Sequence, residues 1–190
     1  KLQLIRNLDM AITKTIKDCC SPMFLEFMKY QAQQSECWHM KYPMGPNSPF
    51  EKKHLKLDVV NGGKKDANND TQLAGMAMSL LLNIYEKEPK YFYPEILFCG
   101  ISLKDRHRED NYHTDHVNDA LKDKKIIKLL GVLNADWDCD VDGGGFTHGG
   151  EVFPLAPCDF LLFDPRVEHR ADDILSDKKR LAIDFTLTAQ

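Results

Sequence analysis

The C-terminal segment carries the pattern that most restricts the fold. From Arg180 to Thr188, small or polar residues alternate with apolar ones, which are Leu181, Ile183, Phe185 and Leu187. A period of two residues is typical of a β-strand, because successive side chains point to opposite faces of a sheet. The apolar face is expected to pack against helices, and the polar face can line a ligand cavity in a small barrel or sandwich.

Several earlier segments also have the character of short strands. Apolar runs predict strands over 96–103, 126–134 and 159–163, and glycines at 143–145 and 149–150 indicate a hairpin between the last two. Roughly seven or eight short strands, with helices ahead of them, are typical of a distorted jelly roll. We therefore predict a mainly β chain of the α+β class.

The N-terminal half, residues 1–95, is expected to support this sheet with helices and early strands. Apolar residues spaced three or four apart predict a helix over 2–17. A second helix is predicted to begin at Asp70 or Thr71 and to end before Pro89. This second helix is apolar on most sides, which predicts a central position.

Two segments between these helices are less regular. Ser21-Pro22 has the character of a helix cap, but Met23 to Tyr30 is compatible with either a strand or a helix. Residues 39–70 are rich in Pro, Gly, Asn and Lys, so they are expected to form a loop with one strand near 55–60. Loops of this length are usually disordered or functional, and the part over 43–70 is our candidate lid.

Composition favours a single domain over residues 1–190. A chain of 190 residues with 43% hydrophobic content can bury one sizeable core. The formal net charge of −4 provides no basic field for nucleic acid. No apolar run approaches the roughly 20 residues that a helix needs to cross a bilayer. We expect a soluble protein with neither nucleic acid nor membrane as a partner.

The cysteines indicate a reducing environment. The six cysteines show no CxxC spacing, and Cys19 and Cys20 are adjacent, which suits a disulfide framework poorly. Reduced thiols and a cytoplasmic location are therefore expected. The first residue is Lys1, so the sequence need not contain the natural N-terminus.

A histidine and an aspartate in the second half of the chain predict a metal site. If residues 111–116 form a strand, His113 and Asp115 project to the same side, and His116 projects to the other. A third ligand from a distant strand would complete the 2-His-1-carboxylate site that suits Fe(II) and leaves positions open. His169 is our candidate for this ligand.

Arg180 begins the polar face of the C-terminal strand. Its neighbours on that face, Ala182 and Asp184, are expected to flank the same cavity, whereas Lys179 points the other way. A solvated charge run is the simpler interpretation of an arginine that follows two lysines. Its position on the polar face favours a functional role, since a guanidinium can bind a carboxylate through two hydrogen bonds.

Other candidate residues have two readings. Trp137 lies between strands and is either a buried anchor or a lip that contacts substrate. Arg106 lies in a charged loop, where it contacts a substrate or is simply solvated. His107 and His148 are expected to be surface groups in loops.

The order and spacing of these residues resemble a known family. His113-x-Asp115, then His169 fifty-six residues further on and Arg180 eleven residues after that, is similar to the His-x-Asp…His…Arg/Lys pattern of the Fe(II)/2-oxoglutarate-dependent dioxygenases. His-x-Asp alone is common by chance. The four positions in order are a considerably stronger signal.

Landmarks between these positions resemble the prolyl 4-hydroxylase branch. The segment 133–138, Leu-Asn-Ala-Asp-Trp-Asp, the pair Gly143-Gly144 and the run Pro157 to Phe163 are similar to the core of hypoxia-inducible-factor-type prolyl hydroxylases. This resemblance covers about residues 96–188. It implies a double-stranded β-helix in which these residues form the metal-binding core.

The resemblance also implies an activity and its cofactors. Fe(II) would be held by His113, Asp115 and His169, and Arg180 would bind the far carboxylate of 2-oxoglutarate. The implied reaction hydroxylates a prolyl residue of a peptide or protein and releases succinate and carbon dioxide, with ascorbate as the reductant. No catalytic residue beyond the metal ligands is implied.

One departure from that branch leaves the substrate open. Val132 stands where hypoxia-type prolyl hydroxylases have a tyrosine that helps to hold the far carboxylate. The alternatives are a hydroxylase of a free amino acid or other small molecule, and a non-catalytic jelly-roll binding module. The sequence does not indicate an oligomeric state.

Overall fold

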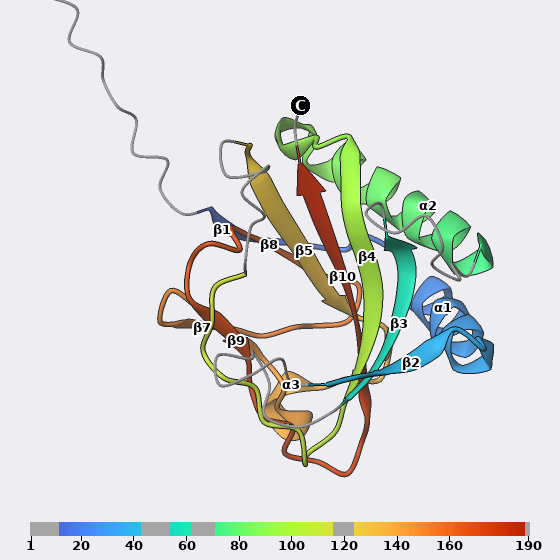
Figure 1. Ribbon diagram of the computed structural model, residues 1–190, viewed down its shortest axis with the longest axis vertical. Helices are drawn as coiled ribbons and strands as arrows, with labels where there is room; N and C mark the ends of the chain where they lie inside the picture. Colours follow the sequence, from blue (N-terminus) through green and yellow to red (C-terminus); the bar gives the residue numbers. More distant parts are fainter. Residues whose placement is uncertain (1–11, 43–53, 62–70, 116–123, 189–190) are drawn as a thin grey trace, which may run out of the picture.

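Two antiparallel sheets and two long helices make up the structure, a computed structural model that describes residues 12–42, 54–61, 71–115 and 124–188 (Figure 1). The larger sheet has the strand order β1-β8-β5-β10-β4-β3-β2, and the smaller sheet has the order β7-β6-β9. The larger sheet contains β1 (Thr13–Ile16), β2 (Trp38–Lys41), β3 (His54–Asn61), β4 (Glu95–Lys104), β5 (Ile126–Val132), β8 (Phe160–Phe163) and β10 (Arg180–Thr188). The smaller sheet contains β6 (Phe146–His148), β7 (Glu151–Phe153) and β9 (His169–Ala171).

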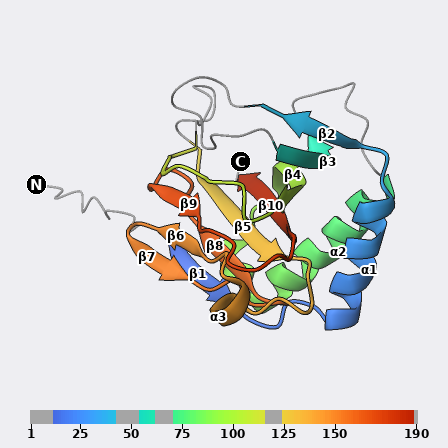
Figure 2. The ribbon, with the colours of Figure 1, turned by 90° about the horizontal axis from the view of Figure 1, so that it is seen from below.

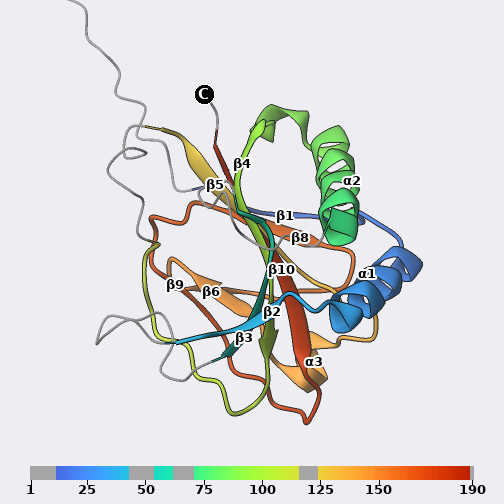
Figure 3. The same cartoon turned by 45° about the vertical axis from the view of Figure 1, so that its right-hand side comes forward.

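The two long helices, α1 and α2, lie against one face of the large sheet, and the small sheet lies on its other side (Figure 3). The helices are α1 (Pro22–Gln34), α2 (Thr71–Lys87), the short 3₁₀ helix η1 (Pro89–Tyr91) and α3 (Cys139–Asp142). Figure 2 shows α1 and α2 side by side beneath the sheet. The predicted class, a mainly β double-stranded β-helix with supporting helices, is confirmed.

Strand β10 divides the interior into two parts, as its alternation predicts. Leu181, Ile183, Phe185 and Leu187 lie in the core between the large sheet and the helices α1 and α2. On the opposite face, Ala182 packs in a second cluster with Val132 and Phe146, between the two sheets. One strand therefore supports the hydrophobic core with one face and forms a wall of the inter-sheet space with the other.

The segment after Ser21, which the sequence left as either a strand or a helix, is a helix. Ser21 Oγ accepts a hydrogen bond from the Phe24 amide at 3.2 Å, and Pro22 occupies the first turn. The face of α1 that carries Leu25, Met28 and Ala32 is fully buried. Capping chemistry therefore decided between helix and strand here.

The helix predicted after Asp70 is confirmed as α2, but its predicted central position is wrong. Leu73, Leu80 and Leu81 are buried beneath the sheet, whereas Met78 and Leu82 are 44% and 53% exposed. A helix that lies on one face of a sheet has an outer side, and apolar residues on that side stay in contact with solvent.

Near the N-terminus, the predicted helix over 2–17 is wrong where it can be compared. Residues 13–16 form the strand β1, which pairs with β8 from Thr13 opposite Phe163 to Ile16 opposite Phe160. Pairing at the edge of β8 satisfies backbone groups that would otherwise be open, and Thr and Ile suit a strand. Residues 1–11 lie outside the described part of the chain.

The candidate lid over 43–70 contains one element that the structure describes. Strand β3 occupies 54–61 and pairs with both β2 and β4. Residues 43–53 and 62–70 lie outside the described residues, so the lid stays a prediction. All six cysteines are free thiols, and none of the described helices has the length and hydropathy needed to cross a membrane.

We expect that Gly131→Ala destabilises the protein by about 1–3 kcal/mol because the core beside β5 has no room for a methyl group. A Cβ at Gly131 would lie 2.7 Å from two ring carbons of Phe160, which is itself fully buried. The matched control is Gly75→Ala on the exposed side of α2, where a Cβ meets nothing within 4 Å. The control should stabilise the helix by about 0.5–1 kcal/mol. Urea unfolding of the two variants measures both effects, and equal stabilities would contradict the packing described here.

Candidate metal centre

Three potential metal ligands converge between the two sheets. One ligand atom from each of His113, Asp115 and His169 lies within 4.8 Å of the other two. The Nε2 atoms of His113 and His169 are each 3.8 Å from a carboxylate oxygen of Asp115. The arrangement is the two-imidazole, one-carboxylate set expected from the sequence.

A single β-bridge brings the two histidines together. The His113 amide donates to the His169 carbonyl at 3.0 Å, and the His169 amide donates to the His113 carbonyl at 2.8 Å. The Asp115 amide donates to the Pro165 carbonyl at 2.9 Å, which fixes the carboxylate beside them. The predicted strand over 111–116 is wrong, because residues 111–115 form this one bridge and no regular ladder. His116 lies outside the described residues.

Backbone carbonyls set the orientation of both imidazole rings. Nδ1 of His113 lies 2.8 Å from the Asn111 carbonyl oxygen, and Nδ1 of His169 lies 2.7 Å from the Val167 carbonyl oxygen. Because a carbonyl only accepts, each Nδ1 must carry the proton, and each Nε2 of a neutral ring keeps its lone pair. Ligating histidines are usually held in this way through the second ring nitrogen.

The charge states at neutral pH also suit a divalent metal. Burial lowers the pKa of His169 to about 4, so its imidazole is neutral at pH 7. Burial raises the pKa of Asp115, but the Lys128 ammonium at 2.8 Å and the two imidazoles lower it by more, and the pKa falls below its ordinary value. Neutral imidazoles and an ionised carboxylate are the forms that bind metal. The donor set therefore fits Fe(II).

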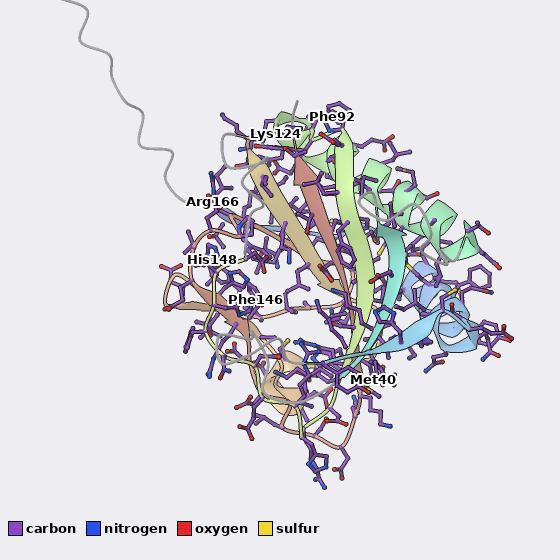
Figure 4. The ribbon with its side chains drawn as sticks, viewed as in Figure 1. Met40, Phe92, Lys124, Phe146, His148 and Arg166 are labelled. Carbon is purple, nitrogen blue, oxygen red and sulfur yellow. The ribbon has the colours of Figure 1, made fainter. Side chains whose placement is uncertain are left out.

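The triad opens into a cavity of about 160 Å³ between the sheets. Phe146 of β6 lies on the small-sheet side of this space, next to the buried His148 (Figure 4). The polar face of β10 forms the opposite wall through Arg180, Ala182 and Asp184. The structure thus brings the three candidate ligands and Arg180 into one cavity.

Arg180 lines this cavity and has one buried donor without a partner among the described residues. The residue is 3% exposed, and one terminal nitrogen donates to the Gly144 carbonyl. Its Nε is buried and has no hydrogen-bond partner among the described residues. Burial and the nearby Arg108 guanidinium lower the pKa of Arg180 to about 10, so it stays charged at pH 7. A buried cation with a free donor fits the carboxylate of a ligand.

Trp137 anchors the loop that holds Arg180. The indole is 3% exposed, and its Nε1 donates to the Gly143 carbonyl at 3.1 Å. A Cβ at Gly144 would lie 3.1 Å from Arg180 and 3.2 Å from Trp137, and its φ of +70° favours glycine. Of the two readings of Trp137, the structure favours the buried anchor.

A buried ion network near Arg180 was missed by sequence reasoning. Lys104 is 1% exposed, and it donates to Asp110 and to the Ala171 carbonyl, both at 2.9 Å. Arg108 donates to the other oxygen of Asp110 at 2.9 Å. In the sequence these residues belong to a charged loop that resembles a solvated one. Lys104 directly follows the predicted apolar strand over 96–103, and this position is the feature of the sequence that could have indicated its burial.

Two other lysines of the cavity were also missed. Lys128 of β5 contacts both Asp115 and Asp184, at 2.8 and 3.7 Å. Lys56 of β3 lies 3.9 Å from Asp184. Lys128 is the one charged residue of the apolar strand β5. Because it is two residues from Leu130, both side chains point to the same face, and this pattern could have predicted that Lys128 points inward.

The remaining candidates lie elsewhere. Arg106 has a side chain that is 53% exposed, forms an ion pair with Asp177 at 2.5 Å and is not among the residues that line the cavity. His107 is exposed, as expected. The prediction that His148 is a surface group is wrong. It is 3% exposed in β6, where its ring nitrogens contact the Thr13 hydroxyl and the Asp164 carbonyl and link the two sheets.

Solved structures show what this architecture is similar to. The prolyl-4-hydroxylase of Pseudomonas putida matches 94% of this chain and 92% of its own, with a TM-score of 0.60 and 14% identity. A Trichoplax adhaerens prolyl hydroxylase, in complex with a hypoxia-inducible-factor peptide, matches 93% and 83%, with a TM-score of 0.61 and 15% identity. HygX of Streptomyces hygroscopicus, with nickel, 2-oxoglutarate and hygromycin B bound, matches 96% and 84%, with a TM-score of 0.62 and 13% identity.

The chain has the fold of the 2-oxoglutarate-dependent dioxygenases. The expected likeness to prolyl hydroxylases is confirmed at the level of the fold. No family model matches the chain. A curated protein, SAGA factor-like TAF6 of Drosophila melanogaster, is 33% identical over 61 residues. That match spans 32% of this chain and 8% of the relative, so it carries no argument about the whole protein.

We expect His113→Ala, Asp115→Ala and His169→Ala each to weaken the binding of Co(II), used as a stable substitute for Fe(II), by at least about 100-fold. Even residues that only orient metal ligands contribute 10- to 100-fold to affinity. Isothermal titration calorimetry at pH 7 measures the effect. His107→Ala, which removes an exposed histidine, is the control and should bind as the wild type does. Unchanged affinity in the three variants would rule out this metal site.

Proposed function

We propose that this protein is an Fe(II)- and 2-oxoglutarate-dependent dioxygenase that hydroxylates a prolyl residue of a peptide or protein. The observation that carries the proposal is the shared cavity of the His113–Asp115–His169 triad and the buried guanidinium of Arg180. A binding module would need neither the converging Nε2 lone pairs nor a buried cation with an unused donor. The fold, shared with prolyl hydroxylases, adds to this support.

Each residue has a defined task in this proposal. Nε2 of His113, Nε2 of His169 and the carboxylate of Asp115 would hold the iron. Arg180 binds the far carboxylate of 2-oxoglutarate with its unused donor. Iron with 2-oxoglutarate supplies the oxidation, in which one oxygen atom of O₂ enters succinate, the other enters the substrate as a hydroxyl, and carbon dioxide is released. Ascorbate is the proposed reductant that keeps the iron as Fe(II).

The size of the cavity bears on the substrate. Pockets that enclose drug-sized ligands usually measure about 300–1,000 Å³. The cavity of about 160 Å³ has room for a small diacid but not for a second ligand of similar size. A substrate that presents a single residue from outside, such as a peptide, therefore suits the described residues better than an enclosed small molecule. Hydroxylation of a small molecule stays the alternative, because HygX, which shares the fold, binds hygromycin B.

The reaction is tested with Fe(II), 2-oxoglutarate, ascorbate and a panel of proline-containing peptides. We expect succinate to form and a peptide to gain the mass of one oxygen atom. His113→Ala and Asp115→Ala should reduce both signals to background, because the metal cannot be held. Mass spectrometry detects both products. Succinate formation that survives these substitutions would remove the mechanism, and its absence from the wild type under every condition would favour the binding module.

The role of Arg180 is tested with Arg180→Lys. Lysine keeps the charge but lacks the Nε donor and the planar guanidinium, so the KM for 2-oxoglutarate should rise by about tenfold or more. Steady-state succinate formation at varied 2-oxoglutarate measures this constant. Arg106→Lys, which changes an exposed arginine outside the cavity, is the matched control and should keep the wild-type KM for 2-oxoglutarate. An unchanged KM in Arg180→Lys would show that another group holds the far carboxylate.

A further inference from the structure

Lys104 is a fully buried lysine at the end of β4. Lysine is almost never fully buried unless its charge is paired, because removing an ammonium group from water is costly. The contacts that offset this cost therefore indicate the role of the residue.

Lys104 connects the two sheets at the end of the cavity that holds Arg180. Its backbone belongs to the large sheet, where it lies directly opposite Arg180 in the register of β4 and β10. Its ammonium group reaches the small sheet and donates to the Ala171 carbonyl of β9 at 2.9 Å. Ala171 is two residues after the candidate metal ligand His169 on the same strand. One side chain therefore joins the backbone beside Arg180 to the strand that carries His169.

Asp110 holds the ammonium group in this position. Its Oδ2 accepts a hydrogen bond from Lys104 Nζ at 2.9 Å, and its Oδ1 accepts one from Arg108 Nε at 2.9 Å. The Asp110 side chain is 3% exposed. Because each carboxylate oxygen has a cationic partner, a rotation of the carboxylate would leave buried charge uncompensated. The ammonium group is thus fixed from two sides, by a carboxylate and by a carbonyl of the small sheet.

The bond to Ala171 differs from the other contacts in the middle of the space between the sheets. There, apolar side chains such as Val132, Phe146 and Ala182 form one cluster. Apolar packing has no preferred direction, whereas a hydrogen bond keeps its donor and acceptor within about 2.7–3.2 Å. The Lys104 side chain therefore sets the spacing of β4 and β9 more closely than packing alone can.

This spacing bears on the co-substrate. In the proposed function, 2-oxoglutarate lies between the metal and Arg180. The small sheet carries His169 and the large sheet carries Arg180, so a shift of one sheet changes the span available to the diacid. Asp110, Ala171 and Arg180 line the cavity, but Lys104 is not among the described residues that line it. Lys104 therefore acts through its neighbours and not by touching the ligand.

We propose that Lys104 is a positioning residue that restricts the co-substrate to a 2-oxo diacid of one chain length. The proposal rests on the proposed function and adds a determinant of its co-substrate specificity. By holding β9 at a fixed distance from β4 and β10, Lys104 fits the span between the metal and Arg180 to 2-oxoglutarate. A diacid that is longer by one methylene group does not fit this span.

The test compares the binding of 2-oxoglutarate and 2-oxoadipate, which is one methylene group longer, to protein loaded with Co(II). Isothermal titration calorimetry measures both dissociation constants. One methylene group changes recognition in a fitted site by about tenfold or more. We therefore expect the wild-type protein to bind 2-oxoglutarate at least about tenfold more tightly than 2-oxoadipate.

A variant assigns this preference to Lys104. Lys104→Met keeps an unbranched side chain but removes the hydrogen bonds to Asp110 and Ala171, so the preference should fall by about fivefold or more. Gly131→Ala is the control, because it strains the core beside Phe160 without touching the connection between the sheets, and it should keep the wild-type preference. Circular dichroism confirms folding, and Lys104→Gln replaces Lys104→Met if that variant does not fold.

The outcomes separate this proposal from the proposed function. An equal loss of affinity for both diacids in Lys104→Met would show a merely structural role and overturn the proposal, even where succinate forms. A wild-type protein that binds both diacids equally would also overturn it. Preference in the wild type and its loss in Lys104→Met support the proposal, and absence of succinate formation would then overturn only the proposed catalysis. Binding of neither diacid would overturn both.

Discussion

The candidate site depends on one pair of backbone hydrogen bonds, those that His113 and His169 exchange. The pair joins a segment without regular strand structure to the first residue of β9. It sets the spacing of the two backbones, and carbonyl groups two residues away in each segment then orient the rings. Because backbone groups position the two imidazole rings, their arrangement requires few specific side chains beyond the ligands themselves.

The two faces of β10 make this local arrangement possible. One face is buried against the helices, so the strand is held in the hydrophobic core. The other face can then carry Arg180 and Asp184 into a cavity at the cost of their desolvation. The alternation of β10 thus gives one face of the strand to the hydrophobic core and the other face to the candidate site. The helices contribute to the site only through the position they give to this sheet.

The cost of burying charge is reduced by sharing partners. Asp110 accepts from both Lys104 and Arg108, and Lys104 also reaches the Ala171 carbonyl of β9. This network links the end of β4 to the small sheet, behind Arg180. Breaking one member would leave a buried charge uncompensated, which is far more costly than losing a surface pair. The cavity wall is therefore stiffened by the groups that give it its charge.

The sequence by itself determined the alternation of β10, the helix α2, the main strands and the order of the four residues His113, Asp115, His169 and Arg180. These signals are local periodicities or ordered motifs, which depend on neighbouring residues. Tertiary structure decided the rest. Residues 13–16 became a strand because β8 has an edge to pair, and residues 111–115 needed only one bridge to β9. The inward positions of Lys56 and His148 follow from the packing of two sheets, and no local pattern reports which polar groups meet across that space.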